Sequence, residues 1–358
     1  MPPNYFGDVM NGVFPPAPEI VRDESELDDW LTRPRPELVD FIRSVSSPLV
    51  ILGAGGKMGP TLAVLAKRAA QLADHPLAVI AVSRFSDQAA RQWLEHRGVA
   101  TVSADLLSRE AVQKLPDAAN VIYLVGLKFG TRENPARTWA VNTLAPAHAA
   151  ERYPQSRFVA LSTGNVYPFV SVAGGGAREK DALTPLGEYA NAAVARERIF
   201  EYFGQMHGNP MALLRLNYAV ELRYGVLVDI ARKVFTGEAI DVTSGYFNCI
   251  WQGDANEMIL RALLLASSPP VAFNLTGPSV LSVRTIAARF SELLDRPVTF
   301  VGTESDTALL SNSECLSGII GSAPTSLDTV LRWTANWVQN GGRFLNRPTH
   351  FEVRDGKY

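Results

Sequence analysis

Short apolar runs alternate with helix-length segments through the first half of the chain. The runs lie at residues 49–52, 77–82, 100–102, 121–125 and 158–161. Between the first two runs, residues 58–73 carry apolar positions at helical spacing. Strands that alternate with helices in this way are typical of a parallel sheet with helices on both faces. The pattern therefore predicts an α/β fold built on a Rossmann-type doubly wound parallel sheet.

The second half of the chain follows a less regular pattern. A long helix is expected over 187–203, a strand over 211–216, an irregular region from 219 to about 301 and a helix over 326–339. Within the first 47 residues, one amphipathic stretch at 24–45 is expected to pack on the domain that follows it. We predict four parts: an N-terminal appendage (1–47), a Rossmann domain (48–218), a smaller lobe from which some elements return to the main domain (219–345), and a polar tail (346–358).

Composition and charge exclude several classes of protein. Hydrophobic residues make up 47% of the 358 residues, and the net charge is -2 with both signs interspersed, so the basic stripe that nucleic acid requires is absent from the sequence. The sequence shows neither an apolar run of about 18 residues nor a signal peptide. Cys249 and Cys315 lie far apart, which suggests neither a disulfide nor a metal site. We expect a soluble, cytoplasmic protein without nucleic-acid or membrane partners, and a homodimer is compatible with the sequence.

A glycine-rich turn between the first strand and the first helix carries the most specific chemistry. It reads Gly53-Ala54-Gly55-Gly56-Lys57-Met58-Gly59. Glycines at such a turn let the backbone pass close under a pyrophosphate at the N-terminus of the next helix. The same set could form an ordinary tight turn, but the strand before it and the helix after it favour nucleotide binding. We therefore predict that Gly53, Gly55, Gly56, Lys57, Met58 and Gly59 contact NAD or NADP.

The end of the second strand bears on the choice between these two cofactors. NAD-selective proteins usually place an acid here, on the ribose 2′-hydroxyl, whereas this sequence reads Ser83-Arg84-Phe85-Ser86. Arg84 can pair with a 2′-phosphate, which slightly favours NADP; the alternative is a solvated surface arginine. After the third strand, Asp105 and Leu106 fit a contact to the adenine ring, although Asp105 could equally cap the next helix.

These residues together resemble the NAD-dependent epimerase/dehydratase family, a group of extended short-chain dehydrogenases/reductases, from about Leu49 to Val338. After the fourth strand, Gly126-Leu127-Lys128 is similar to a stretch of UDP-galactose 4-epimerases whose lysine contacts the cofactor, and the resemblance gives that role to Lys128. Asn142, within Trp139-Ala140-Val141-Asn142-Thr143, matches the family's helix asparagine beside the active site. The alternative for Asn142 is a polar residue satisfied within its own helix.

The fifth strand leads into a second stretch of resemblance, Leu161-Ser162-Thr163-Gly164-Asn165-Val166-Tyr167-Pro168. It is similar to the family's Ser-Thr segment followed by Val-Tyr, which implies that Thr163 is the catalytic hydroxyl that hydrogen-bonds the reacting substrate oxygen. Ser162 and Thr163 could also be ordinary caps at a strand end. Arg215, Asn217 and Asp254 match later positions of the family pattern and are expected to be mainly architectural.

The sequence departs from the family at its catalytic pair. The family places Tyr-x-x-x-Lys on one helix, because residues four apart share a face and the lysine charge assists the tyrosine. Here the helix reads Tyr189-Ala190-Asn191-Ala192-Ala193, so the tyrosine is present and alanine stands in the lysine position. The nearest cation on that face, Arg196, lies about 10 Å further along the helix axis than Tyr189. Tyr189 is therefore expected to bind cofactor and to act mainly as a hydrogen-bond donor.

The substrate is less well defined by the sequence. The segment before Phe247-Asn248-Cys249-Ile250-Trp251 lacks the basic residue that many nucleotide-sugar members present near there. Asn217, Arg223 and Tyr224 are candidate substrate contacts, as is Lys233, each with a plain surface or structural role as the alternative. The resemblance implies an enzyme that transfers hydride between NAD(P) and a sugar, sugar acid or nucleotide sugar. The missing lysine supports an alternative, a catalytically impaired NAD(P)-binding protein that acts as a sensor or partner subunit.

Overall fold

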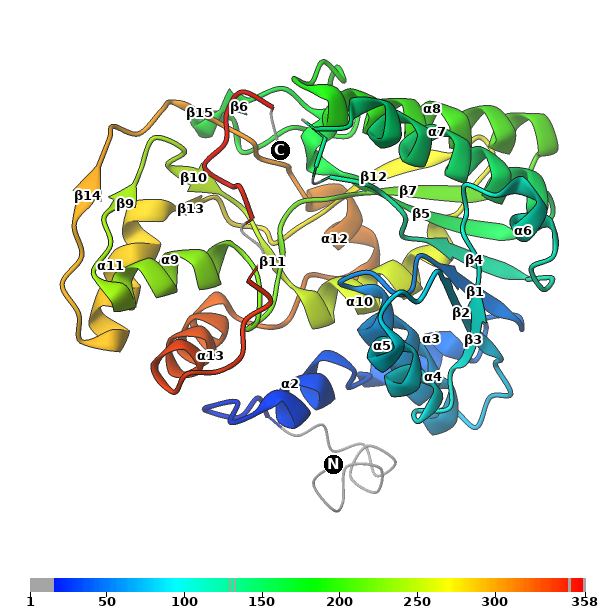
Figure 1. Cartoon of the computed structure of the whole chain (residues 1–358), viewed down its shortest axis with the longest axis horizontal. Coiled ribbons are helices and arrows are strands. Elements are labelled where there is room, and N and C mark those ends of the chain that lie inside the picture. Colours follow the sequence, from blue (N-terminus) through cyan, green and yellow to red (C-terminus); the bar gives the residue numbers. More distant parts are fainter. Residues whose placement is uncertain (1–15, 129, 132, 347–348, 357–358) are drawn as a thin grey trace.

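A seven-stranded parallel sheet forms the main unit of the protein, and a smaller lobe lies beside it (Figure 1). The computed structural model describes residues 16–128, 130–131, 133–346 and 349–356. The strand order is β12-β7-β5-β4-β1-β2-β3. In chain order the bounds are β1 (Leu49–Leu52), β2 (Val79–Ser83), β3 (Ala100–Ser103), β4 (Asn120–Tyr123), β5 (Arg157–Thr163), β7 (Met211–Leu216) and β12 (Val271–Leu275). The predicted Rossmann-type sheet is confirmed.

Helices cover both faces of this sheet because its central strands are apolar on both sides. In β1, Leu49 and Ile51 belong to one buried cluster, and Val50 and Leu52 belong to another. The first cluster is shared with α3 (Pro36–Ile42), α4 (Gly59–Leu72), α5 (Gln88–Glu95), α10 (Gln252–Arg261) and α12 (Glu314–Ile320). The second is shared with α6 (Arg109–Gln113), α7 (Pro135–Arg152) and α8 (Glu188–His207). Strands buried on both faces read as continuous apolar runs, which is the pattern seen in the sequence.

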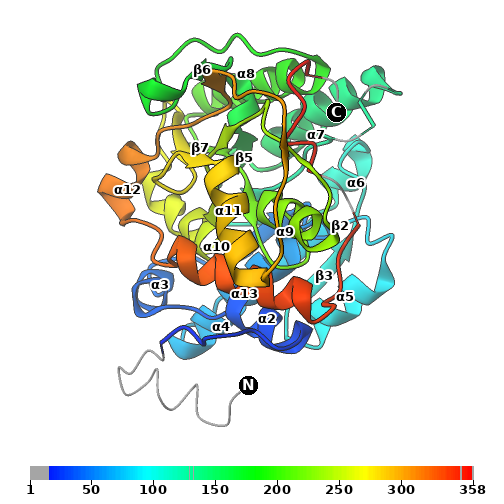
Figure 2. The same ribbon diagram turned by 90° about the vertical axis from the view of Figure 1, so that its left-hand side faces the viewer.

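The lobe has its own buried core, formed by three amphipathic helices. These are α9 (Val226–Thr236), α11 (Val283–Leu294) and α13 (Leu327–Gln339), seen together in Figure 2. Two-stranded pairs extend the lobe and connect it to the main unit: β8 (Ala219–Val220) with β11 (Ile250–Trp251), β9 (Ile240–Asp241) with β14 (Phe300–Val301), β10 (Tyr246–Phe247) with β13 (Leu281–Ser282), and β6 (Val170–Ser171) with β15 (Thr307–Ala308). Short 3₁₀ turns η1 (Gly164–Val166), η2 (Val172–Gly174) and η3 (Ala262–Leu265) complete the chain. β12, α10 and α12 belong to the main unit although they follow the start of the lobe in sequence.

The N-terminal segment differs from the single amphipathic stretch expected at 24–45. It forms two helices, α2 (Glu24–Leu31) and α3, because Pro34 and Pro36 interrupt the helical hydrogen bonds between them. Leu38 and Ile42 of α3 pack in the core of the main unit, as predicted, whereas Leu27 and Leu31 of α2 pack in the core of the lobe. The segment therefore joins the two units.

The C-terminal tail also connects the two units. The Thr349 hydroxyl donates a hydrogen bond of 2.6 Å to Asp229 on α9. The Gly356 backbone lies against Gly187, directly before α8, so closely that a Cβ atom at Gly187 would lie 2.1 Å from the Gly356 carbonyl oxygen. Within the described residues, no helix is long and apolar enough to cross a membrane.

Candidate functional site

Two pockets meet at the carboxyl edge of the sheet, where the glycine turn follows β1. Gly53, Gly56 and Leu124 line both of them. This point lies between β1 and β4, where the strand order reverses, and ligands of doubly wound sheets bind at such a switch point. We call the pocket that contains Arg84 the Arg84 pocket and the pocket that contains Lys57 the Lys57 pocket. Their volumes are about 260 and 250 Å³.

Three of the four glycines of the turn, Gly53, Gly56 and Gly59, serve two physical roles. Gly53 has φ +85°, and a Cβ atom there would lie 2.7 Å from Val125 Cγ2. A Cβ atom at Gly59 would lie 2.5 Å from Ala54 Cα, so both positions need glycine for the turn itself. At Gly56 the only neighbour within 4 Å of such an atom, among the described residues, is the Gly53 carbonyl oxygen, at 3.3 Å. The absence of a side chain at Gly56 therefore keeps space open in the two pockets, whereas Gly53 and Gly59 are needed for the packing of the turn.

The N-terminus of α4 adjoins this turn and has the character of an anion site. Met58 occupies the N-cap position, and no described side chain accepts a capping hydrogen bond from the first N–H groups of the 14-residue helix. Such N–H groups and the helix dipole favour a negatively charged group. The open space at Gly56 and these backbone donors fit a pyrophosphate.

The Arg84 pocket combines the predicted residues that follow β2 and β3. It is lined by Gly55, Ser83, Arg84, Asp105 and Leu106, and by residues 124–127, which precede Lys128 in the loop after β4. Phe85 and Arg137 also line it, and neither was predicted from the sequence to contact the cofactor. Arg84 is exposed. The Asp105 carboxylate accepts a hydrogen bond from Leu107 N at 3.0 Å, whereas Ser108 caps α6, so Asp105 shapes the turn before that helix and lines the pocket as well.

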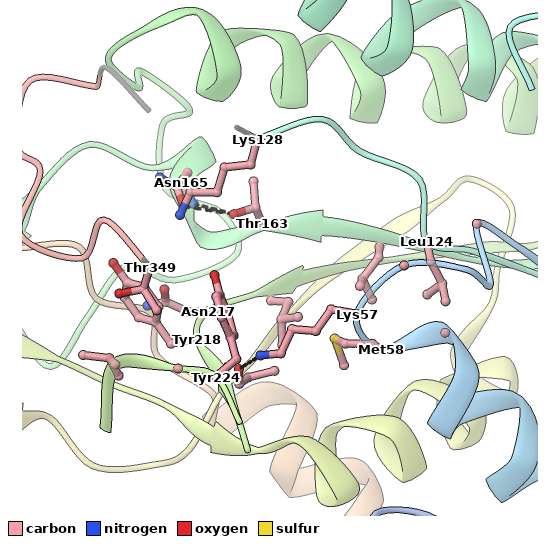
Figure 3. Close-up of a pocket in the computed structure, with 18 residues that line it drawn as sticks. Lys57, Met58, Leu124, Lys128, Thr163, Asn165, Asn217, Tyr218, Tyr224 and Thr349 are labelled. Atoms are coloured by element: carbon pink, nitrogen blue, oxygen red, sulfur yellow. Dashed lines mark hydrogen bonds between the residues drawn. The ribbon is translucent and has the colours of Figure 1, made fainter. Parts of the chain in front are cut away.

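The Lys57 pocket contains two lysine side chains on opposite walls (Figure 3). Lys57 Nζ donates a hydrogen bond of 2.8 Å to the Ala219 carbonyl oxygen and lies 4.0 Å from the centre of the Tyr224 ring. Burial lowers the pKa of Lys57 to about 8, despite the favourable charge of nearby Glu221. Burial likewise lowers the pKa of Lys128 to about 8. Both ammonium groups are thus held in a poorly solvated place, where a negative charge would stabilise them.

Thr163 lies at the end of β5 and lines the Lys57 pocket together with Asn165. Its hydroxyl donates to Asn165 Oδ1 at 3.1 Å and accepts a hydrogen bond from Asn165 N at 3.2 Å. Thr163 therefore caps the turn η1, as its alternative role predicts, and it also borders the pocket. Ser162 instead donates to Glu197, which forms a buried ion pair of 2.7 Å with Arg215, so Arg215 has the expected architectural role.

Tyr189 and Ala193 lie on α8 and are not among the described residues that line the Lys57 pocket. Tyr189 is 7% exposed and is not one of the described residues that line either pocket. Ala193 is fully buried in an apolar cluster with Val166 and Tyr167. Ala193 is thus surrounded by apolar packing.

Arg196 and Asn142 form hydrogen bonds with the loop after β4. Arg196 is 3% exposed, and its Nη1 donates to the Val125 carbonyl oxygen at 3.0 Å and to Asn142 Oδ1 at 2.9 Å. Asn142 is fully buried, and its Nδ2 donates to Thr138 O at 2.8 Å and to Leu127 O at 3.3 Å. Arg196 and Asn142 together hold the carbonyl groups on both sides of Gly126, in the loop that carries Lys128. The hydrogen bond to Thr138 O lies within α7, as the alternative role of Asn142 predicts, and the hydrogen bond to Leu127 O joins Asn142 to this loop as well.

The candidate substrate residues separate into two groups. Asn217 and Tyr224 line the Lys57 pocket. Arg223 points to Glu221, Glu24 and Asp28, and Lys233 pairs with Glu352, so neither contributes to the lining. Sequence reasoning did not identify Thr349, because nothing in the polar tail indicates that it returns to the site. Asp254 accepts two hydrogen bonds of 3.0 Å from Thr325, in agreement with its expected architectural role.

Comparisons with known proteins agree with this geometry. Residues 49–221 match the model of the NAD dependent epimerase/dehydratase family. A search of curated proteins found no matching sequence. Three solved structures are similar: UDP-glucose 4-epimerase of Thermus thermophilus in complex with NAD (17% identity, TM-score 0.65, 82% of this chain and 99% of that chain), UDP-glucuronic acid 4-epimerase of Bacillus cereus in complex with NAD (16%, 0.68, 82% and 96%), and dTDP-glucose 4,6-dehydratase of Bacillus anthracis in complex with NAD (13%, 0.68, 82% and 96%). At these identities the likeness shows the fold. The family match covers the Arg84 pocket and most of the Lys57 pocket, whose residues Tyr224, Gly225, Val226 and Thr349 lie outside it. Residues 49–221 of the chain are therefore similar to the NAD dependent epimerase/dehydratase family.

Proposed function

We propose that the protein binds NAD(P) across the two pockets and transfers hydride between this cofactor and a carbon of a sugar or sugar acid. The observation that carries the proposal is the junction of the pockets at Gly53 and Gly56, beside the uncapped N-terminus of α4. In this arrangement the pyrophosphate lies at the junction, the adenosine half lies in the Arg84 pocket, and the nicotinamide half enters the Lys57 pocket. The dinucleotide, when bound, supplies the hydride donor or acceptor.

The chain's own residues provide binding and orientation. Thr163 borders the Lys57 pocket and can hydrogen-bond the substrate oxygen that gains or loses a proton. Asn142 and Arg196 fix the loop that carries Lys128. Tyr189 lines neither pocket among the described residues, and its contact with the cofactor stays a prediction from the sequence. The proposed preference for NADP depends on Arg84, whose guanidinium is exposed at the mouth of its pocket.

Calorimetry with NAD, NADP and their reduced forms tests the central claim. Gly56→Val should abolish binding, because Gly56 lines both pockets and the added side chain would occupy their junction. Gly318→Val is the matched control, since Gly318 is exposed on α12 and a Cβ atom there meets no described atom within 4 Å. If the unmodified protein binds no dinucleotide, or if Gly56→Val binds as well as the control, the proposal is wrong.

One observation favours a second candidate function, an NAD(P)-binding protein with little turnover. Ala193, which the resemblance aligns with the family's lysine, is packed in an apolar cluster, and this packing supports the second function. The two functions differ in turnover, which cofactor absorbance measures with sugars and sugar acids as substrates. Dinucleotide binding without any turnover across such a set supports the sensor or partner-subunit role.

The proposed homodimer rests on a separate observation. Trp139 and Leu144 on α7, and Tyr202 and Met206 on α8, are exposed apolar side chains on two helices that pack together. Light scattering on the purified protein tests this assembly, and a monomer at all concentrations would contradict it.

A further inference from the structure

We propose that Arg137, in the first turn of α7, forms an ion pair with the pyrophosphate of the dinucleotide. This inference rests on the proposed function and adds a cofactor-binding residue that the sequence pattern does not assign. The backbone of the glycine turn and the guanidinium group of Arg137 then hold the same ligand group from two different elements of the fold.

The first argument is the position of Arg137 in the Arg84 pocket. Arg137 lines this pocket, as do three glycines of the turn before α4, namely Gly53, Gly55 and Gly56. Arg137, Val141 and Ala145 lie four residues apart along α7 and therefore share one face of the helix. All three line the pocket, so this face of α7 is one of its walls.

The order of the strands decides which phosphate Arg137 meets. β1 lies between β4 and β2 in the sheet, and the glycine turn follows β1. Arg84 follows β2, whereas α7 follows β4. A group bound at the turn therefore has Arg84 on the β2 side and Arg137 on the β4 side. We assign the 2′-phosphate of NADP to Arg84 and the pyrophosphate, which lies at the turn, to Arg137.

The second argument is that the guanidinium group of Arg137 is unoccupied. Its backbone N–H donates to the helix cap Asn134, but its exposed side chain forms neither a hydrogen bond nor an ion pair with any of the described residues. Other exposed arginines do form ion pairs, for example Arg109 with Glu151. A guanidinium group carries five N–H donors in a planar arrangement that suits phosphate oxygens. These donors are available to a ligand.

The acids of the same pocket are the competing partners for Arg137. Asp87 and Asp105 both line the pocket. Each carboxylate accepts a hydrogen bond from a backbone N–H two residues later, at 2.9 Å from Ala89 N and at 3.0 Å from Leu107 N. Both acids follow β2 or β3, on the side of the pocket that carries Arg84. They are thus engaged at local turns and leave Arg137 to the ligand.

The third argument is the unfavourable place of this cation in its helix. α7 begins at Pro135, so Arg137 lies where the helix dipole is positive, and the first turn contains no acidic residue. Asn134 caps the helix without adding a negative charge. A bound pyrophosphate is attracted both by the dipole and by the guanidinium group, and it offsets their mutual repulsion. Arg137 is therefore better suited to ligand binding than to the stability of α7.

Calorimetry of the full chain with NAD and with NADP tests the assignment. Arg137→Met should weaken the binding of both about tenfold, the range of a charge-assisted hydrogen bond. The losses should be equal because both cofactors contain the pyrophosphate. Arg137→Lys keeps the charge and should lose less affinity than Arg137→Met. Arg198→Met removes an exposed arginine from α8 and is the control, which should leave both affinities unchanged.

Urea unfolding of the ligand-free proteins separates binding from folding. Arg137→Met should unfold at the same urea concentration as the unmodified protein or at a higher one, because the substitution removes a cation from the first turn of α7. A lower midpoint together with weaker binding would show that the side chain supports the fold instead, and it would overturn the inference.

Two binding results would also overturn the inference. It is wrong if Arg137→Met binds both dinucleotides as tightly as the unmodified protein does. It is equally wrong if the variant loses affinity for NADP alone, since that loss would assign Arg137 to the 2′-phosphate. Failure of the proposed function gives a different result, namely no dinucleotide binding by the unmodified protein.

Discussion

Burial of the charged side chain of Lys57, in the glycine turn, should lower the free energy of unfolding at neutral pH. The variant Lys57→Met tests this prediction. A pKa of about 8 in place of 10.5 corresponds to about 3 kcal/mol lost when the charged group is buried. Lys57→Met removes this cost and keeps much of the volume, but it loses the hydrogen bond to Ala219 O and the contact with the Tyr224 ring, each worth about 1 kcal/mol. We therefore expect the variant to be more stable than the unmodified protein by about 1 kcal/mol at pH 7.

The pH dependence of the difference is a sharper test than its size. Between pH 8 and pH 10.5 the unfolded chain keeps the proton on Lys57 and the folded protein releases it, so the folded protein gains stability as the pH rises. From pH 7 to pH 10 this gain is about 2.5 kcal/mol, and it is absent from the variant. The unmodified protein should therefore become the more stable of the two at pH 10. Glu221, Arg223 and Asp229, the charged groups that act on Lys57, are present in both proteins.

Urea unfolding without ligand, at pH 7 and pH 10, measures both quantities. Lys114→Met is the control, because the Lys114 side chain is 72% exposed and its difference from the unmodified protein should not depend on pH in this way. A Lys57→Met difference that is the same at pH 7 and pH 10 would refute the reasoning, since it would show that Lys57 is not held at a lowered pKa.

Three further predictions concern the cofactor and the helix α8. Arg84→Ala should weaken NADP binding by about 1.5–3 kcal/mol and leave NAD unchanged in calorimetry; equal dissociation constants in the unmodified protein would contradict this. Tyr189→Phe should reduce turnover of the best substrate less than tenfold across a pH series, because Tyr189 does not line the Lys57 pocket, and loss of nearly all activity would show that Tyr189 is the base. Arg196→Met should weaken dinucleotide binding and couple to Asn142→Ala by about 0.5–3 kcal/mol in a double-mutant cycle, whereas the exposed Arg198→Met should not; additive effects would contradict the shared support of the loop.

The sequence predicted the main unit because its signals are local. Strands buried on both faces must be apolar throughout, and a turn that passes under a pyrophosphate must contain glycine, so both are visible in a short window of residues. For the same reason, Gly53, Gly56, Arg84 and Thr163 could be placed at the carboxyl edge of the sheet from the sequence alone. The boundaries were less accurate: β2 begins at Val79 rather than at residue 77, and α8 continues to His207.

Only the tertiary structure decided which residues line the pocket and how large it is. Arg223, Lys57 and Lys128 are all cations in the sequence, but Arg223 meets three carboxylates, whereas the two lysines face a pocket whose described lining has none. Thr349 reaches the site from the polar tail, whereas the other described residues of the wall lie between Gly53 and Val226, and no local pattern encodes that return. Charge pairing and pocket volume depend on contacts between residues far apart in the chain, and the folded arrangement alone determines which of these contacts form.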